Sequence, residues 1–88
     1  MGFDSVEIVM MFEEHFEIEI TDQEAASIYT VGEMRDLVCK KLIAKNYRAN
    51  PDFILKEIID LTANFARIDV KKINVTSDFT KDLKIIEE

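Results

Sequence analysis

The chain has 88 residues, of which 48% are hydrophobic and 33% are charged, and this length and balance indicate one small globular domain. Two glycines and one proline argue against a turn-rich β sandwich or barrel, and the single cysteine, Cys39, excludes an internal disulfide. The formal net charge of −7 argues against a nucleic-acid partner, and no apolar run approaches the roughly 20 residues that a membrane span requires.

The charge is unevenly distributed along the chain. Met1 to Met34 holds nine acidic residues and no Lys or Arg, whereas Arg35 to Glu88 holds nine acidic and eleven basic residues. A strongly anionic first third favours a partner with a basic patch, reached by electrostatic steering. The alternative is an acidic surface that serves only solubility.

The first predicted element is a helix from Asp4 to Phe16, with Asp4 or Ser5 as its N-cap. Its apolar residues recur at mixed three- and four-residue steps, which is typical of a helix with a broad apolar face. They are Val6, Val9, Met10, Phe12 and Phe16. The next four residues, Glu17 to Ile20, alternate polar and apolar, and we expect a connector that buries Ile18 and Ile20.

Two capping boxes follow, each with a Thr and a Glu three residues later. Thr21 with Glu24 predicts a short helix from Asp22 to about Ser27. Thr30 with Glu33 predicts a longer helix from Val31 to about Ala44. The residues expected to face inward are Met34, Leu37, Val38, Leu42 and Ile43.

The polar stretch from Asn46 to Asn50 is expected to be a linker. Asn50 followed by Pro51 is typical of an N-cap and first helical position, because the N–H that proline lacks would be unpaired there. This predicts a third long helix from Pro51 to about Phe65. Its apolar stripe is expected to be Ile54, Ile58, Leu61 and Phe65, with Phe53 beside it.

After Ala66 the periodicity ends. Apolar residues are spaced irregularly among Lys, Asp, Ser and Thr, which predicts a long ordered loop held by apolar anchors, with a helical turn near Ser77 to Leu83. The candidate anchors are Ile68, Val70, Ile73, Val75, Phe79, Leu83 and Ile85.

The first half of the chain resembles the acyl carrier proteins. Gly2-Phe3-Asp4-Ser5-Val6, with Val6 to Met10 and Phe12 to Phe16, is similar to that family's second helix. Glu17 to Asp22, Ala25-Ala26 and Thr30 to Glu33 are similar to its third helix and the start of its fourth.

The second half resembles the part of the family that precedes the attachment motif. Phe53 to Phe65 is similar to the family's first helix, and Ile68 to Ile73 with Phe79 to Leu83 is similar to its long first loop, most closely in mitochondrial-type carriers. The resemblance implies an all-α, small acyl-carrier-like four-helix bundle with a long loop and a circularly permuted helix order, II-III-IV-I. The expected single domain comprises residues 1–45 (helices II to IV), a linker at 46–50, and residues 51–88 (helix I and the loop).

In this family, a serine carries a 4'-phosphopantetheine arm, and the resemblance implies Ser5 as that attachment site, flanked by Asp4. One departure stands against it: Val6 follows Ser5 directly, whereas in the family the corresponding run starts four residues after the modified serine. Two interpretations of Ser5 stay open, as the carrier site or as a helix-terminal serine without an arm.

The resemblance implies a carrier of acyl chains as thioesters in fatty-acid synthesis, and not an enzyme. The expected partners are a phosphopantetheinyl transferase and synthesis enzymes with basic docking patches. The acids expected to meet them are Glu7, Glu13, Glu14 and Glu19. The residues expected to line the space for the acyl chain, or simply to form core, are Val9, Phe12, Val38, Leu42, Ile58 and Phe65.

No catalytic or metal site is expected from the sequence. His15 is the only histidine and is expected at the surface, while Cys39 is expected to be a buried, inert thiol. Two other functions stay open: a helical interaction module without an arm, and an engineered permutant. A soluble protein of the mitochondrial matrix (as the mature form) or of a bacterial cytoplasm is expected, as a monomer or a domain-swapped dimer through the linker.

Overall fold

The structure is a computed structural model that describes residues 6–84, and within that range it is all-helical. The helices are α1 (Val6–Phe16), α2 (Asp22–Ala26), α3 (Val31–Ala44), α4 (Pro51–Ala66) and the 3₁₀ helix η1 (Val70–Lys72). The predicted all-α class is confirmed. The N-cap predicted at Asp4 or Ser5, and the apolar anchor predicted at Ile85, lie outside the described residues.

Both predicted capping boxes are formed. The Thr21 hydroxyl accepts from the backbone N–H of Glu24, whose carboxylate accepts from the backbone N–H of Thr21. Thr30 and Glu33 make the same reciprocal pair at the start of α3. Each box satisfies N–H groups that the first turn of a helix leaves free, which explains why both helices begin where the sequence predicts.

The start of α4 is also as predicted. The Asn50 side chain accepts from the backbone N–H groups of Asp52 and Phe53, at 3.0 and 3.3 Å, and Pro51 occupies the first position of the helix. The linker before it makes a hydrogen bond from the Lys45 ammonium to the backbone carbonyl of Glu17. The chain therefore reverses direction between α3 and α4 in the predicted place.

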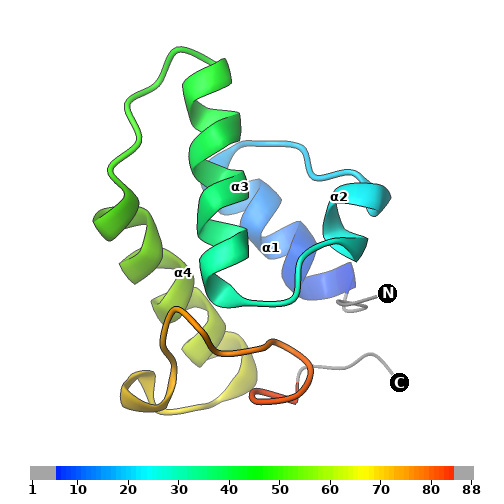
Figure 1. The fold of residues 1–88 in the computed structure, drawn as a ribbon, viewed down its shortest axis with the longest axis vertical. Helices are drawn as coiled ribbons and strands as arrows, with labels where there is room; N and C mark the ends of the chain where they lie inside the picture. The colour runs from blue at the N-terminus through cyan, green and yellow to red at the C-terminus, as the bar shows by residue number, and fades with distance from the viewer. Residues whose placement is uncertain (1–5, 85–88) are drawn as a thin grey trace.

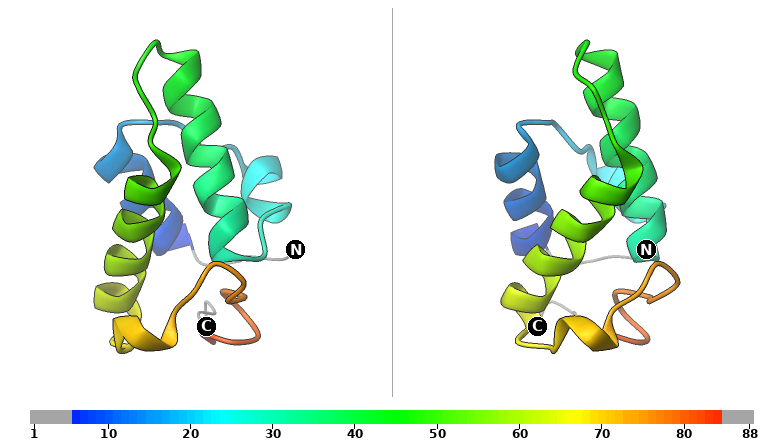
Figure 2. Two further views of the ribbon diagram at one scale, coloured as in Figure 1. Left: turned by 60° about the vertical axis from the view of Figure 1, so that its left-hand side comes forward. Right: turned by 90° about the vertical axis from the view of Figure 1, so that its left-hand side faces the viewer.

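The helices are arranged around α3 (Figure 1). In that view α4 lies on one side of α3, α2 lies on the other, and α1 passes behind. The segment after α4 runs beneath one end of the helices, and both turned views in Figure 2 place it there. The C-terminal segment of the described chain thus lies against the helices that precede it.

This segment is attached to the start of α3 by backbone hydrogen bonds. The N–H groups of Val31 and Gly32 donate to the carbonyls of Ser77 and Val75, at 3.0 and 2.9 Å, and the N–H of Phe79 donates to the carbonyl of Tyr29 at 2.9 Å. The Phe79 ring lies 6.3 Å from the ring of Phe12 on α1. The loop is therefore ordered by contacts with distant parts of the chain.

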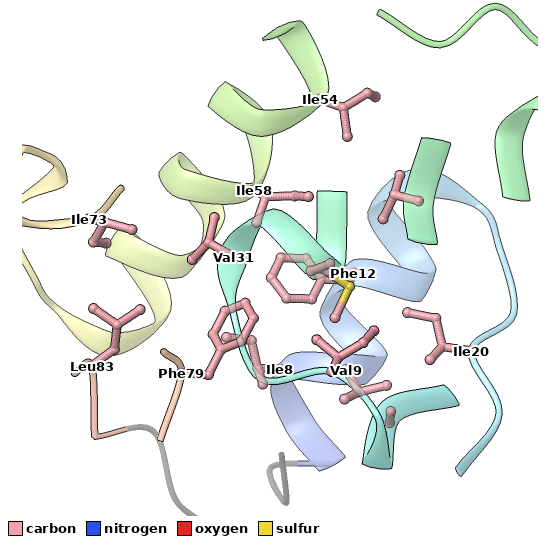
Figure 3. Packing of buried hydrophobic residues seen from close by; sticks show 14 of the residues in the cluster. Ile8, Val9, Phe12, Ile20, Val31, Ile54, Ile58, Ile73, Phe79 and Leu83 are labelled. Carbon is pink, nitrogen blue, oxygen red and sulfur yellow. The ribbon is translucent and has the colours of Figure 1, made fainter. Parts of the chain in front are cut away.

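One continuous buried cluster joins both halves of the chain, and Figure 3 shows ten of its side chains labelled. α1, α3 and α4 supply most of it, while Ile18 and Ile20 of the connector are buried as predicted. Of the predicted loop anchors, Ile73, Phe79 and Leu83 are buried, whereas Val70 and Val75 are exposed. Ile68 is partly buried against the same cluster, so four of the predicted anchors hold the loop.

Three apolar side chains differ from their predicted positions. Ile43 near the end of α3 is 60% exposed, because α3 extends there beyond its buried neighbours. Phe65, predicted in the inward stripe of α4, is 37% exposed, and Met10, predicted on the apolar face of the first helix, is 50% exposed. The buried face of α4 instead follows four-residue steps, from Ile54 to Ile58 to Thr62.

Within residues 6–84, no helix combines the length and the apolar character that crossing a membrane would require.

Candidate functional site

The outward face of α1 carries acids around an apolar centre. Glu7, Met10 and Glu14 are exposed and follow one another at three- and four-residue steps, so they share one face of the helix. Met10 is 50% exposed. Together with Met11, His15 and Leu61 they line an open groove of about 530 Å³ between α1 and α4.

The acids of this face, and Glu19 in the connector after α1, form no ion pair in the described part of the chain. The ion pairs within residues 6–84 are His15–Glu57, Arg35–Asp36 and Lys41–Glu24. Glu7, Glu14 and Glu19 are exposed and belong to none of them. Three of the four acids predicted to meet a partner are therefore available to one.

Glu13 has a different environment from the other three acids. It is half-buried, and its carboxylate accepts a hydrogen bond of 2.8 Å from the backbone N–H of Ile20. That bond fixes the connector that buries Ile18 and Ile20. The Glu13 side chain is thus occupied inside the domain, which the sequence did not indicate.

The C-terminal end of α1 contacts α4 through a side-chain hydrogen bond. The His15 Nε2 atom lies 2.7 Å from a carboxylate oxygen of Glu57, and the imidazole ring meets the Phe16 ring edge-on at 4.8 Å between centroids. His15 is exposed, as predicted. No group of three His, Cys, Asp or Glu side chains in residues 6–84 could hold a metal ion.

The structure brings together most of the residues predicted to line an acyl site. Val9, Phe12 and Ile58 belong to the buried cluster (Figure 3). Val38 belongs to it as well, and Leu42 is partly buried against it. Phe65 is not brought to them, because it lies on the exposed side of α4. The shared interior is therefore built by α1, α3 and α4, with Phe79 of the loop contributing from the other end of the chain.

Cys39 is half-buried on α3 and is a free thiol. Burial raises the pKa of this thiol, and the nearby Arg35 cation opposes that effect only in part. The raised pKa favours the thiol over the nucleophilic thiolate. The sequence predicted a buried thiol, whereas Cys39 is only half-buried.

An apolar groove at the linker end was not predicted. Phe16, Leu42 and Ile54, from three helices, line it together with the side chains of Tyr47 and Phe53. Tyr47 and Phe53 are 60% and 59% exposed. The only sequence signal for it was the position of Phe53 outside the inward stripe of α4.

The predicted attachment residues, Ser5 and Asp4, lie outside the described residues. The described part of α1 begins at Val6, the residue that follows Ser5 in the chain.

Comparison with known proteins gives related sequences. The chain is 48% identical over 44 residues to the acyl carrier protein of Buchnera aphidicola subsp. Acyrthosiphon pisum (strain Tuc7), a match that covers 50% of this chain and 55% of that protein. It is 50% identical over 40 residues to the acyl carrier proteins of Picosynechococcus sp. (strain ATCC 27264 / PCC 7002 / PR-6) and Caulobacter vibrioides (strain NA1000 / CB15N). Each of these two matches covers 46% of this chain, and they cover 49% and 51% of the respective relatives.

Along about half of its length, the chain is homologous to acyl carrier proteins. It spans about half the length of the curated relatives it matches. No family model matches it, and no solved structure matches it. The homology agrees with the small helical bundle described above, and it confirms the resemblance to acyl carrier proteins on which the sequence analysis depended.

Proposed function

We propose that this protein is a non-catalytic carrier of acyl groups in fatty-acid synthesis, loaded through a 4'-phosphopantetheine arm on Ser5. The observation that carries the proposal is the homology to acyl carrier proteins over half of the chain. When attached, the arm supplies a terminal thiol that holds the acyl group as a thioester. Residues of the chain itself would recognise the partners and shield the acyl group from water.

The first part of that task is partner recognition. Glu7, Glu14 and Glu19 are exposed and form no ion pair in residues 6–84, so basic groups of a partner can approach them. The exposed Met10 between Glu7 and Glu14 adds an apolar centre to the same face. This arrangement supports a phosphopantetheinyl transferase and synthesis enzymes with basic docking patches as partners.

The second part is shielding of the cargo from water. Transfer of an acyl chain from water to an apolar interior is favourable by about 0.8 kcal/mol per buried CH₂ group. Val9, Phe12, Val38 and Ile58 would surround such a chain between α1, α3 and α4, with Leu42 at the edge. They form core when the interior is empty of cargo.

We further propose that the helix order is a circular permutation of the family's order. The support is the contact of the last segment with α1, the helix that this loop would directly precede in the family, together with its backbone hydrogen bonds to the start of α3. The test is a chain in which residues 51–88 precede residues 1–50. It should give the same helical circular-dichroism spectrum and a free energy of unfolding within about 1 kcal/mol of the original. A reordered chain that stays unfolded would show that the two halves do not form this bundle.

A helical interaction module without an arm is the second candidate function. The spacing between Ser5 and Val6 favours it, because the family's attachment serine is separated from the corresponding run by one helical turn.

One loading experiment separates the two candidates. The chain is incubated with coenzyme A and a phosphopantetheinyl transferase, and its intact mass is measured. We expect the original chain and a Ser27→Ala control to gain the arm, and Ser5→Ala to gain none. No gain by any chain would favour the interaction module, and a gain by Ser5→Ala would place the arm on another residue.

Partner binding tests the acidic face of α1. We expect replacement of Glu7, Glu14 and Glu19 by Gln to weaken binding to the transferase about five- to tenfold at low salt, since exposed ion pairs contribute about 0.2–1 kcal/mol each. Asp52→Asn, an exposed charge change at the start of α4, is the matched control. Affinity that does not change with salt, or an equal loss in the control, would contradict docking on α1.

The compartment and the assembly are also proposals. The relatives reported above are bacterial and give no support to the mitochondrial matrix, so we propose the bacterial cytoplasm. A monomer is the simplest assembly, because the described chain closes its own buried cluster; the domain-swapped dimer stays the alternative.

A further inference from the structure

Thr62 is a fully buried polar residue on the inner face of α4. Its exposed fraction is 0%, and its hydroxyl has no hydrogen-bond partner within residues 6–84. The other buried polar side chain, Ser77, accepts a bond of 3.0 Å from the backbone N–H of Asn74. Of these two buried hydroxyls, only that of Thr62 is left unpaired.

An unpaired buried hydroxyl is costly, since it has lost its hydrogen bonds to water and gained none in return. It lies one helical turn after Ile58, on the same face of α4, and Ile58 is one of the residues predicted to surround the acyl chain. The cluster around that space is otherwise made of apolar side chains. The buried cluster therefore contains one hydroxyl that is left without a partner in residues 6–84 and that an oxygen atom of a bound chain could satisfy.

We infer that the Thr62 hydroxyl favours acyl chains that carry an oxygen substituent, such as a keto or hydroxy group, over fully saturated chains. The inference rests on the proposed function for the nature of the cargo. The hydroxyl would donate to a keto oxygen, or exchange a hydrogen bond with a hydroxy group, inside a space from which water is excluded. A saturated chain would leave the hydroxyl as unpaired as it is now.

The first test uses the protein without a phosphopantetheine arm or an acyl chain. Thr62→Val keeps the shape and removes the hydroxyl, so we expect its urea midpoint to rise. Ser77→Ala removes a paired hydroxyl and should lower the midpoint. A Thr62→Val midpoint that falls as the Ser77→Ala midpoint does would mean that the Thr62 hydroxyl already has a partner, and the inference would be wrong.

The second test uses free probes and needs no arm. Binding of the seven-carbon methyl ketone and of the seven-carbon terminal alkene is measured from NMR shifts of α4 amides. We expect the ketone to bind the original chain about fivefold more tightly than it binds Thr62→Val, with the alkene binding both equally. Equal ketone affinities would overturn the inference. Failure to load Ser5 would leave these results unaffected and would count only against the proposed function.

Discussion

Replacement of Gly32 by Ala directly tests the packing of the C-terminal segment on α3. Gly32 is buried in the first turn of α3, and its N–H donates to the Val75 carbonyl at 2.9 Å. A Cβ added there would lie 2.7 Å from Val75 Cγ2 and 2.9 Å from the Val75 carbonyl oxygen. The Val75 side chain can turn away, but its carbonyl is held by the same N–H and must move with the loop.

Two opposing terms set the magnitude of this effect. Forcing an extra methyl group into a packed contact costs about 1–3 kcal/mol, while Ala in place of Gly stabilises a helix by roughly 0.5–1 kcal/mol. We expect a net loss of about 1–2 kcal/mol. For a domain of this size, that corresponds to a fall of roughly 5–15 °C in the melting temperature.

The assay is urea unfolding followed by far-ultraviolet circular dichroism. Lys40→Ala, at an exposed position of the same helix, is the control and should stay within about 0.5 kcal/mol of the original. Adding Val75→Ala to Gly32→Ala should restore only part of the loss, because the carbonyl oxygen stays in place. A Gly32→Ala chain more stable than the original would refute the contact, and with it the packing of the two halves.

Three further substitutions test local features of the fold. Thr30→Ala removes the N-cap of α3 and should cost about 1 kcal/mol in urea unfolding. Glu13→Ala frees the N–H of Ile20 and should cost about 1.5–3 kcal/mol, whereas the exposed Glu14→Ala should change stability by less than about 0.5 kcal/mol; equal losses would contradict the role of Glu13. The Lys41 ammonium, and then the Thr21 N–H, hold the pKa of Glu24 below its ordinary value of 4.5, so the stability this carboxylate adds is present above that pH and is lost as the pH falls through and below it. The free energy of unfolding, measured as a function of pH, should therefore fall less steeply in acid for Glu24→Gln than for the original chain. Identical pH dependences would contradict the pairing of Glu24 with Lys41.

Helix starts were predictable from the sequence because their causes are local. A Thr with a Glu three residues later, or an Asn before a Pro, satisfies the free N–H groups of the first turn with atoms a few residues away. Thr21, Thr30 and Asn50 all cap the helices they were expected to cap. No knowledge of the rest of the fold was required.

The loop and the side of α4 that is buried were less predictable, because tertiary packing decides both. By their spacing, Leu61 and Phe65 fit an inward stripe of α4 as well as Thr62 does. In the folded chain, however, Thr62 is fully buried and Phe65 is 37% exposed. Val75 is as apolar as Ile73, but its side chain lies beside Gly32 and is 38% exposed, and its carbonyl accepts the hydrogen bond from α3. The internal role of Glu13 was not predictable for the same reason, because its hydrogen-bond partner, the N–H of Ile20, is seven residues away across the end of a helix.

The order of the two halves has a consequence for how the domain folds. Phe12 and Phe79 lie 67 positions apart in this chain, whereas α3 and α4 are joined by a short linker and pack against each other. Contacts between nearby segments require less loop closure and form earlier. In the reordered chain, Phe79 would precede Phe12 by 21 positions, and α3 and α4 would no longer be neighbours in sequence. The native contacts are the same in both orders, so their equilibrium stabilities should be similar. Their folding transition states should differ: here we expect the α3–α4 hairpin to form first and the loop to attach last, since its contacts with α1 and α3 span the greatest length of chain.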